Sequence, residues 1–80
     1  MIEFESVRGC VADVLDFDPE AVGAGTPLPE LPGWDSVNGL RVLNALESEF
    51  RVRLGLAAFS AAKTVGELHG LIDEGSAHAR

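Results

Sequence analysis

The sequence predicts a small all-α bundle of three main helices plus one or two short helices, with a long loop between the first and second main helices. Three segments, roughly residues 3–15, 36–50 and 65–73, space apolar residues by three and four, which is typical of amphipathic helices. Residues 16–35 are rich in Gly and Pro, which interrupt helices. Because three amphipathic stripes can share one core, we expect a single helical bundle.

The first helix is expected from about Glu3 to Leu15. It should end before Pro19, because the residue that precedes a proline is disfavoured in the helical conformation. Cys10 borders the apolar stripe, and we expect it to be a small buried residue rather than a reactive thiol. The stripe consists of Phe4, Val7, Val11, Val14 and Leu15.

A loop as long as residues 16–35 is uncommon in a compact domain unless it has structure or contacts of its own. We expect at most one short helical turn, which Asp18-Pro19-Glu20 would begin with Pro at the first position. Apolar side chains spread along the loop should hold it against the core. These anchors are Phe17, Val22, Leu28, Leu31 and Trp34.

Residues 36–50 have the clearest helical pattern, and either Asp35 or Ser36 is expected to cap its N-terminus. Gly39 lies one turn into this helix, where Gly is less favourable than Ala by about 1 kcal/mol. Close packing against a neighbour and clearance for a bound group both explain a glycine there. The expected apolar stripe is Val37, Leu40, Leu43, Leu46 and Phe50.

A connector and a short helix should follow. Residues 51–55 alternate polar and apolar residues but have no strand to pair with, so we interpret them as an extended connector. A short helical turn at about residues 56–61 should point Phe59 inward.

The last helix begins at a capping box, with Thr64 as the cap and Glu67 three residues later. It is expected to end near Asp73, where the apolar periodicity stops. The sequence therefore predicts one domain over residues 1–73 and a disordered tail over residues 74–80.

Composition restricts the possible functions. A chain of 80 residues buries only about 60–65% of its unfolded surface, so a deep enzyme pocket is not expected. The 13 Asp/Glu and 6 Lys/Arg give a formal net charge of −7. This charge disfavours nucleic acid and anionic membranes as partners and favours proteins with basic patches. The small acidic chain should be a monomer.

Cellular location and metal binding are restricted by other features of the sequence. Cys10 is the single cysteine, which precludes an internal disulfide and fits a reducing cytoplasm. The N-terminus has neither the basic nor the apolar region of a signal peptide, and no apolar run approaches the ~20 residues that span a bilayer. We therefore expect a cytoplasmic protein. One Cys and two His provide no metal-ligand spacing.

Ser36 is the main candidate for a functional residue. It places a hydroxyl, preceded by Asp35, at the expected start of a helix, where free N–H groups and the helix dipole suit a phosphate. This favours a serine that is modified over one that attacks a substrate. A triad of Ser36, His69 and Asp35 has no Gly-x-Ser-x-Gly motif to support it. The simpler interpretation of Ser36 is a helix cap.

Four stretches in order resemble the acyl carrier protein family, over roughly residues 3–73. Residues 11–20 are similar to the end of the family's first helix, and residues 33–37 (Gly-Trp-Asp-Ser-Val) to its Asp-Ser-Leu attachment motif. Residues 43–50 resemble its second helix, which ends in an acidic run before Phe, and residues 64–68 the start of its last helix.

The resemblance implies that Ser36 is esterified to 4′-phosphopantetheine from coenzyme A, and that Asp35 belongs to the same site. The thiol of this arm would carry acyl intermediates as thioesters between enzymes of a polyketide, specialised-metabolite or fatty-acid pathway. The protein itself would be no enzyme. Its partners would be a phosphopantetheinyl transferase and acyl-loading and acyl-processing enzymes. Because Asp35 and the phosphodiester repel, we expect Asp35 to turn toward backbone N–H groups or toward the modifying enzyme.

Three positions depart from the family pattern, since Val37 replaces the usual Leu, and Asn38 and Arg41 replace frequent acidic residues. The acidic residues of this helix, Glu47 and Glu49, lie near its C-terminal end instead. We therefore expect a dedicated set of partners that contact Trp34, Val37, Asn38, Arg41 and Glu47, although an anchoring role for Trp34 is the simpler interpretation. The alternatives are an aminoacyl or peptidyl carrier and a small helical interaction module without a prosthetic group.

Overall fold

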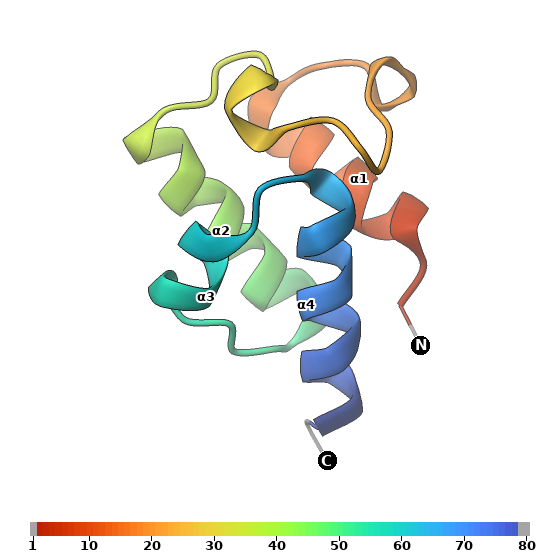
Figure 1. Cartoon of the computed structure of the whole chain (residues 1–80), viewed down its shortest axis with the longest axis vertical. Helices are drawn as coiled ribbons and strands as arrows, with labels where there is room; N and C mark the ends of the chain where they lie inside the picture. The colour runs from red at the N-terminus through yellow and green to blue at the C-terminus, as the bar shows by residue number, and fades with distance from the viewer. Residues whose placement is uncertain (1, 79–80) are drawn as a thin grey trace.

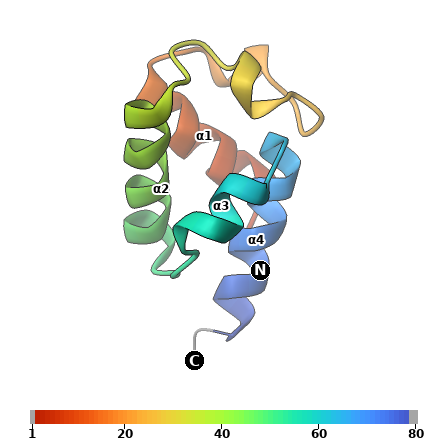
Figure 2. The same cartoon turned by 60° about the vertical axis from the view of Figure 1, so that its left-hand side comes forward.

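The computed structural model describes residues 2–78 and is helical, which confirms the expected all-α class (Figure 1). Within that range it contains no strand, only an isolated bridge between Pro27 and Thr64. The short helix α3 lies between α2 and α4 (Figure 2). The elements are α1 (Phe4–Leu15), η1 (Pro19–Ala21), η2 (Leu28–Glu30), α2 (Ser36–Phe50), α3 (Leu56–Ala61) and α4 (Val65–His78), where η denotes a 3₁₀ turn.

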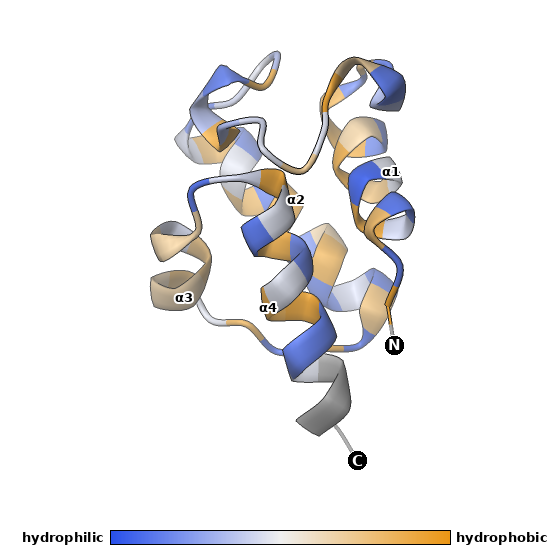
Figure 3. Cartoon of the chain, turned by 45° about the vertical axis from the view of Figure 1, so that its right-hand side comes forward, coloured by the Kyte–Doolittle hydropathy of each residue, from blue (hydrophilic) through white to orange (hydrophobic). Residues whose placement is uncertain are grey.

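The core forms where α1, α2 and α4 turn their apolar sides inward, as the separation of apolar and polar residues on each helix indicates (Figure 3). Full burial of a Val or Leu side chain stabilises a fold by about 1.5–3 kcal/mol, so these residues dominate the stability. Cys10 is only half-buried beside this core, so the expectation that it is buried was wrong. The fully buried side chains are Val7, Val11, Val42, Leu46, Val65, Leu68 and Ile72.

The apolar stripe predicted for α2 is wrong at its N-terminal end. Val37 and Leu40 are 68% and 47% exposed, whereas Val42, which was outside the predicted stripe, is completely buried. Several faces of one helix can satisfy a spacing of three and four, and the neighbouring elements decide which face is covered. Here the faces with Val42, Leu43 and Leu46 join the core.

The loop between α1 and α2 carries two 3₁₀ turns, not at most one. The turn η1 begins at Pro19 with the Asp18 side chain as its cap, as predicted, but η2 was not anticipated. The five predicted anchors are confirmed as members of the core or neighbours packed against it. They hold the loop over the end of the bundle at which α2 and α4 begin (Figure 1).

Backbone hydrogen bonds join the same loop to the start of α4. Leu28 N–H donates to the carbonyl of Lys63 at 2.9 Å, and Gly66 N–H donates to the carbonyl of Ala24 at 2.9 Å. A Cβ at Gly66 would lie 2.9 Å from this Ala24 oxygen, so the close approach requires glycine. The loop is therefore fixed by pairing as well as by apolar contacts.

Arg8 of α1 also fixes the loop. Its Nη1 donates to the carbonyl of Val22 at 3.1 Å, and its Nη2 lies 3.5 Å from a carboxylate oxygen of Glu20. The guanidinium lies 5.6 Å from the centre of the Phe4 ring, within the range of a cation–π contact. Sequence reasoning gave Arg8 no role.

The final helix is longer than expected. The Thr64 hydroxyl accepts the N–H of Glu67 at 3.2 Å, as predicted, while the Glu67 carboxylate accepts the N–H of Lys63 at 2.9 Å, one residue before the cap. The predicted end at Asp73 is wrong, because α4 continues to His78. A Cβ at Gly75 would contact Val52 at 3.6 Å, so the connector packs against this extension. Residues 79–80 of the expected tail lie outside the described residues.

Candidate functional site

Asp35, not Ser36, caps helix α2. Its carboxylate oxygen Oδ1 accepts the backbone N–H of Asn38 at 2.8 Å, and its carbonyl accepts the N–H of Gly39 at 2.7 Å. The side chain thus satisfies one donor of the first helical turn. The expectation that Asp35 turns toward backbone N–H groups is confirmed.

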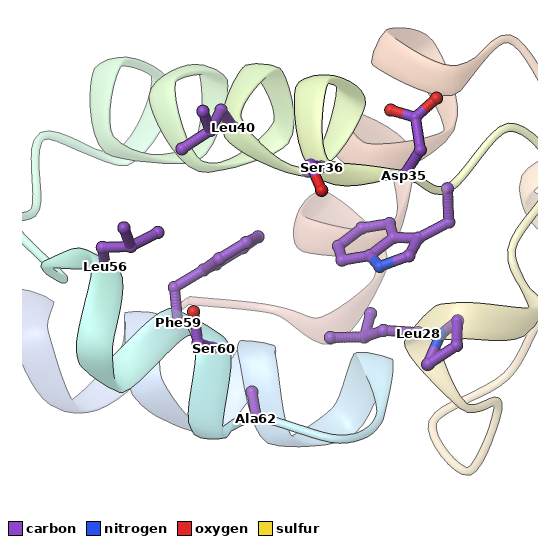
Figure 4. Close-up of a pocket in the computed structure, with 11 residues that line it drawn as sticks. Leu28, Asp35, Ser36, Leu40, Leu56, Phe59, Ser60 and Ala62 are labelled. Carbon is purple, nitrogen blue, oxygen red and sulfur yellow. The ribbon is translucent and has the colours of Figure 1, made fainter.

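Ser36 is the first residue of α2 and is exposed. Because Asp35 takes the capping role, the Ser36 hydroxyl is not needed for it, and the simpler interpretation of Ser36 as a cap is wrong. Figure 4 shows this hydroxyl pointing from α2 toward α3. The N–H groups of the first helical turn and the positive end of the dipole lie beside it, which favours an anion there.

A hollow of about 590 Å³ lies beside Ser36, between α2, α3 and the loop (Figure 4). Leu40 of α2 and Leu56 of α3 contribute to opposite walls. The Trp34 and Phe59 rings lie 6.0 Å apart at 30°, and Phe59 points inward as predicted. The lining is mostly apolar and consists of Leu28, Pro29, Trp34, Asp35, Ser36, Gly39, Leu40, Leu56, Phe59, Ser60 and Ala62.

Among the described residues, those that line the hollow include no His, Cys or Lys. His69 lies elsewhere, on the α1 side, where its Nε2 donates to the carbonyl of Ile2 at 2.6 Å and its ring meets Phe4 edge-on. The triad of Ser36, His69 and Asp35 is therefore not formed. The arrangement suits a hydroxyl that accepts a group from a separate enzyme better than a nucleophile with its own base.

Gly39 is buried at the hollow. A Cβ at this position would meet Trp34 Cζ2 at 3.6 Å and Phe59 Cε2 at 4.0 Å, which are ordinary contact distances. Trp34 is half-buried and packs on Phe59, so it has the anchoring position expected for it. An alanine methyl would therefore fit against both rings, so close packing does not require glycine at position 39, although alanine would narrow the hollow.

The other predicted partner-binding residues separate into two groups. Val37, Asn38 and Arg41 lie near Ser36, and Asn38 Nδ2 donates to the carbonyl of Gly33 at 2.7 Å. Gly33 has a φ of +75°, which suits glycine at this turn.

Glu47 forms the second group, because its Oε2 accepts the N–H of Leu54 at 2.8 Å and that of Gly55 at 3.3 Å. It organises the connector, a role that its sequence neighbourhood did not indicate.

Comparison with known families identifies the class. Residues 5–72 match the family described as "Phosphopantetheine attachment site". The match covers most of the chain, so the protein belongs to this family, and the predicted resemblance is confirmed. Members are carrier domains with covalently attached 4′-phosphopantetheine, not catalytic domains. No helix among residues 2–78 is long and apolar enough to cross a bilayer.

Proposed function

We propose that the protein is an acyl carrier protein whose Ser36 hydroxyl is the attachment point for 4′-phosphopantetheine. The observation that supports this most strongly is that two neighbouring residues at the start of α2 have separate roles. Asp35 supplies the cap, while the neighbouring hydroxyl stays exposed within the matched region. When bound, the group supplies a thiol that holds an acyl chain as a thioester.

The residues around Ser36 fit such a group. The first turn of α2 offers N–H groups and a positive dipole end to a phosphodiester on Oγ. The Asp35 carboxylate would repel the phosphodiester, but it accepts a hydrogen bond from the backbone N–H of Asn38, which partly offsets its negative charge. The apolar hollow next to Ser36 offers a surface on which an attached arm can rest.

The pathway and the partners belong to the same proposal. The carrier would serve a polyketide, specialised-metabolite or fatty-acid pathway in the cytoplasm, as a monomer. It would meet a phosphopantetheinyl transferase, a loading enzyme and one or more acyl-processing enzymes in turn. The exposed side of α2 next to Ser36 is the natural place for them, since each must reach the attached arm.

The test is the intact mass of the purified protein before and after incubation with coenzyme A and a permissive phosphopantetheinyl transferase. We expect a gain of one phosphopantetheine in the wild type and none in Ser36→Ala. Ser60→Ala is the matched control, because Ser60 is also exposed and lines the same hollow, and it should be modified fully. No gain in well-folded wild-type protein would refute the carrier function.

A further inference from the structure

Charge is divided unevenly between two parts of the chain. Residues 36–63, which include α2 and α3, contain four basic and two acidic residues, a formal net charge of +2. The remaining residues contain eleven acidic and two basic residues, a net charge of −9. The overall charge of −7 therefore conceals a segment that is not acidic. Its basic residues are Arg41, Arg51, Arg53 and Lys63.

The two acidic residues of this segment lie near the C-terminal end of α2, about three helical turns beyond Ser36. The Glu47 carboxylate is bonded to the connector through two N–H groups. The charge of Glu49 helps to raise the pKa of the Cys10 thiol in α1. The Glu49 carboxylate therefore lies toward α1. Between Ser36 and Leu46 the helix has no acidic residue, and α3 has no charged residue at all.

Apolar side chains are exposed in the same place. Val37, Leu40 and Leu56 are 68%, 47% and 56% exposed, and they are the large apolar residues that stand out at the surface of the described chain. Positions three and four apart share a helix face, so Leu40 and Arg41 are neighbours of Val37. Leu40 and Leu56 contribute to the same hollow, which joins α3 to this surface (Figure 4).

Arg41 is available for a partner. It is exposed, and within residues 2–78 it forms no ion pair. Its Nη1 lies 3.5 Å from Oδ1 of Asn38, at the limit of a hydrogen bond. An arginine beside exposed apolar side chains is suited to a two-pronged contact with a carboxylate, because its planar fork matches that group.

We propose that Val37, Leu40, Arg41 and Leu56, here called the α2–α3 face, form a docking surface for a partner enzyme. The matching surface of that enzyme is an apolar patch flanked by a carboxylate, which pairs with Arg41. This rests on the proposed carrier function, and it specifies the chemistry of the partner. The acidic remainder of the chain repels such a partner, so the charge pattern orients the encounter as well as attracting it. Ser36 lies at one end of the face, which brings the docked enzyme close to the attached group.

The test uses the full-length unmodified protein and two synthetic amphipathic helical peptides with the same leucine pattern, one with glutamates and one with lysines on the polar face. Amide chemical shifts of the isotope-labelled protein are followed during titration. We expect the glutamate peptide to shift Val37, Leu40, Arg41 and Leu56. The lysine peptide should instead shift residues of α1 and α4.

Three variants test the role of Arg41. Arg41→Glu should weaken binding of the glutamate peptide on the order of five- to tenfold. Arg41→Lys keeps the charge and should retain most of the affinity. Arg53→Glu makes the same change in charge at an exposed connector residue and should have a much smaller effect.

Binding of the glutamate peptide away from the α2–α3 face would overturn the proposal. So would equal binding of the lysine peptide on that face, or equal effects of Arg41→Glu and Arg53→Glu. The titration does not need a modified Ser36, so its result is independent of the mass measurement. A protein that gains no phosphopantetheine but binds the glutamate peptide as expected would refute the carrier function and leave the docking face intact.

Discussion

The Asp35 carboxylate lies 2.8 Å from the backbone nitrogen of Asn38 and accepts its N–H. The Asn38 side chain in turn donates to the carbonyl of Gly33, two residues before Asp35. These two contacts fix the path of the chain into α2 from both sides. The capping contribution at this helix therefore belongs to Asp35, and the adjacent Ser36 is free of it.

Substitution of Asp35 should destabilise the protein, whereas substitution of the neighbouring Ser36 should not. Asp35→Ala should lower the free energy of unfolding by about 1 kcal/mol, because the N–H of Asn38 loses its acceptor. Ser36→Ala should leave it within about 0.5 kcal/mol of the wild type, as for an exposed residue without a structural contact. Chemical denaturation followed by circular dichroism measures both. Equal losses in the two variants would contradict the assignment of the cap.

Two helical glycines make a matched pair for the same substitution. Gly39→Ala should raise the free energy of unfolding by about 1 kcal/mol through helix propensity, since the new Cβ meets Trp34 at an ordinary 3.6 Å. Gly66→Ala should lower the melting temperature, because its Cβ would lie 2.9 Å from the Ala24 oxygen and disrupt the hydrogen bond there.

Thermal unfolding compares the two variants, and about 1 kcal/mol corresponds to roughly 4–8 °C in a domain of this size. A loss of acyl transfer in a stabilised Gly39→Ala protein would support the interpretation of Gly39 as clearance for the arm. Unchanged loading and transfer would show that clearance for the arm is not the role of Gly39.

Arg8→Met should destabilise the protein by about 1–3 kcal/mol, because the charged donor to the Val22 carbonyl is lost. The ion pair adds little to this, since the Glu20 side chain is 81% exposed. Hydrogen exchange at residues 20–24 should accelerate more than in the core. Arg53→Met, in the exposed connector, is the control and should change stability by less than about 0.5 kcal/mol. Similar losses in both variants would mean that Arg8 does not hold the loop.

The thiol of Cys10 should react slowly with iodoacetamide. Burial raises its pKa, and the carboxylates of Glu49 and Asp13 raise it further, so less thiolate is present near neutral pH. Labelling of Ser36→Ala protein, which has no attached thiol, should be slower in the folded than in the unfolded state. Glu49→Gln should speed it modestly, since burial is the larger cause. Faster labelling of the folded protein would contradict the raised pKa.

The same shift predicts a pH dependence of stability. A raised pKa in the folded state means that folding favours the protonated thiol. The contribution is complete below the pKa of the unfolded chain and is lost as the pH rises through the pKa of the folded protein. The free energy of unfolding should therefore fall at alkaline pH, and this component should be absent from Cys10→Ala.

Local signals in the sequence predicted much of the fold. The spacing of apolar residues gave the start and end of α1 and α2, because helix periodicity and caps depend on residues within a turn or two. The cap at Thr64 and the turn at Pro19 were predictable for the same reason. Ser36 could be selected because the family motif around it is itself a short local pattern.

Only the tertiary structure decided the rest. Val37 and Leu40 satisfy the helical pattern yet stay exposed, because α1 and α4 cover other faces of α2. The roles of Arg8 and Glu47 depend on loop and connector backbone groups brought to them by folding. Such contacts join residues that are separated along the chain, so a local sequence pattern does not reveal them. The sequence by itself thus determined the three main helices apart from the end of α4, the charge and the candidate serine, while packing determined which side of α2 is left open beside it.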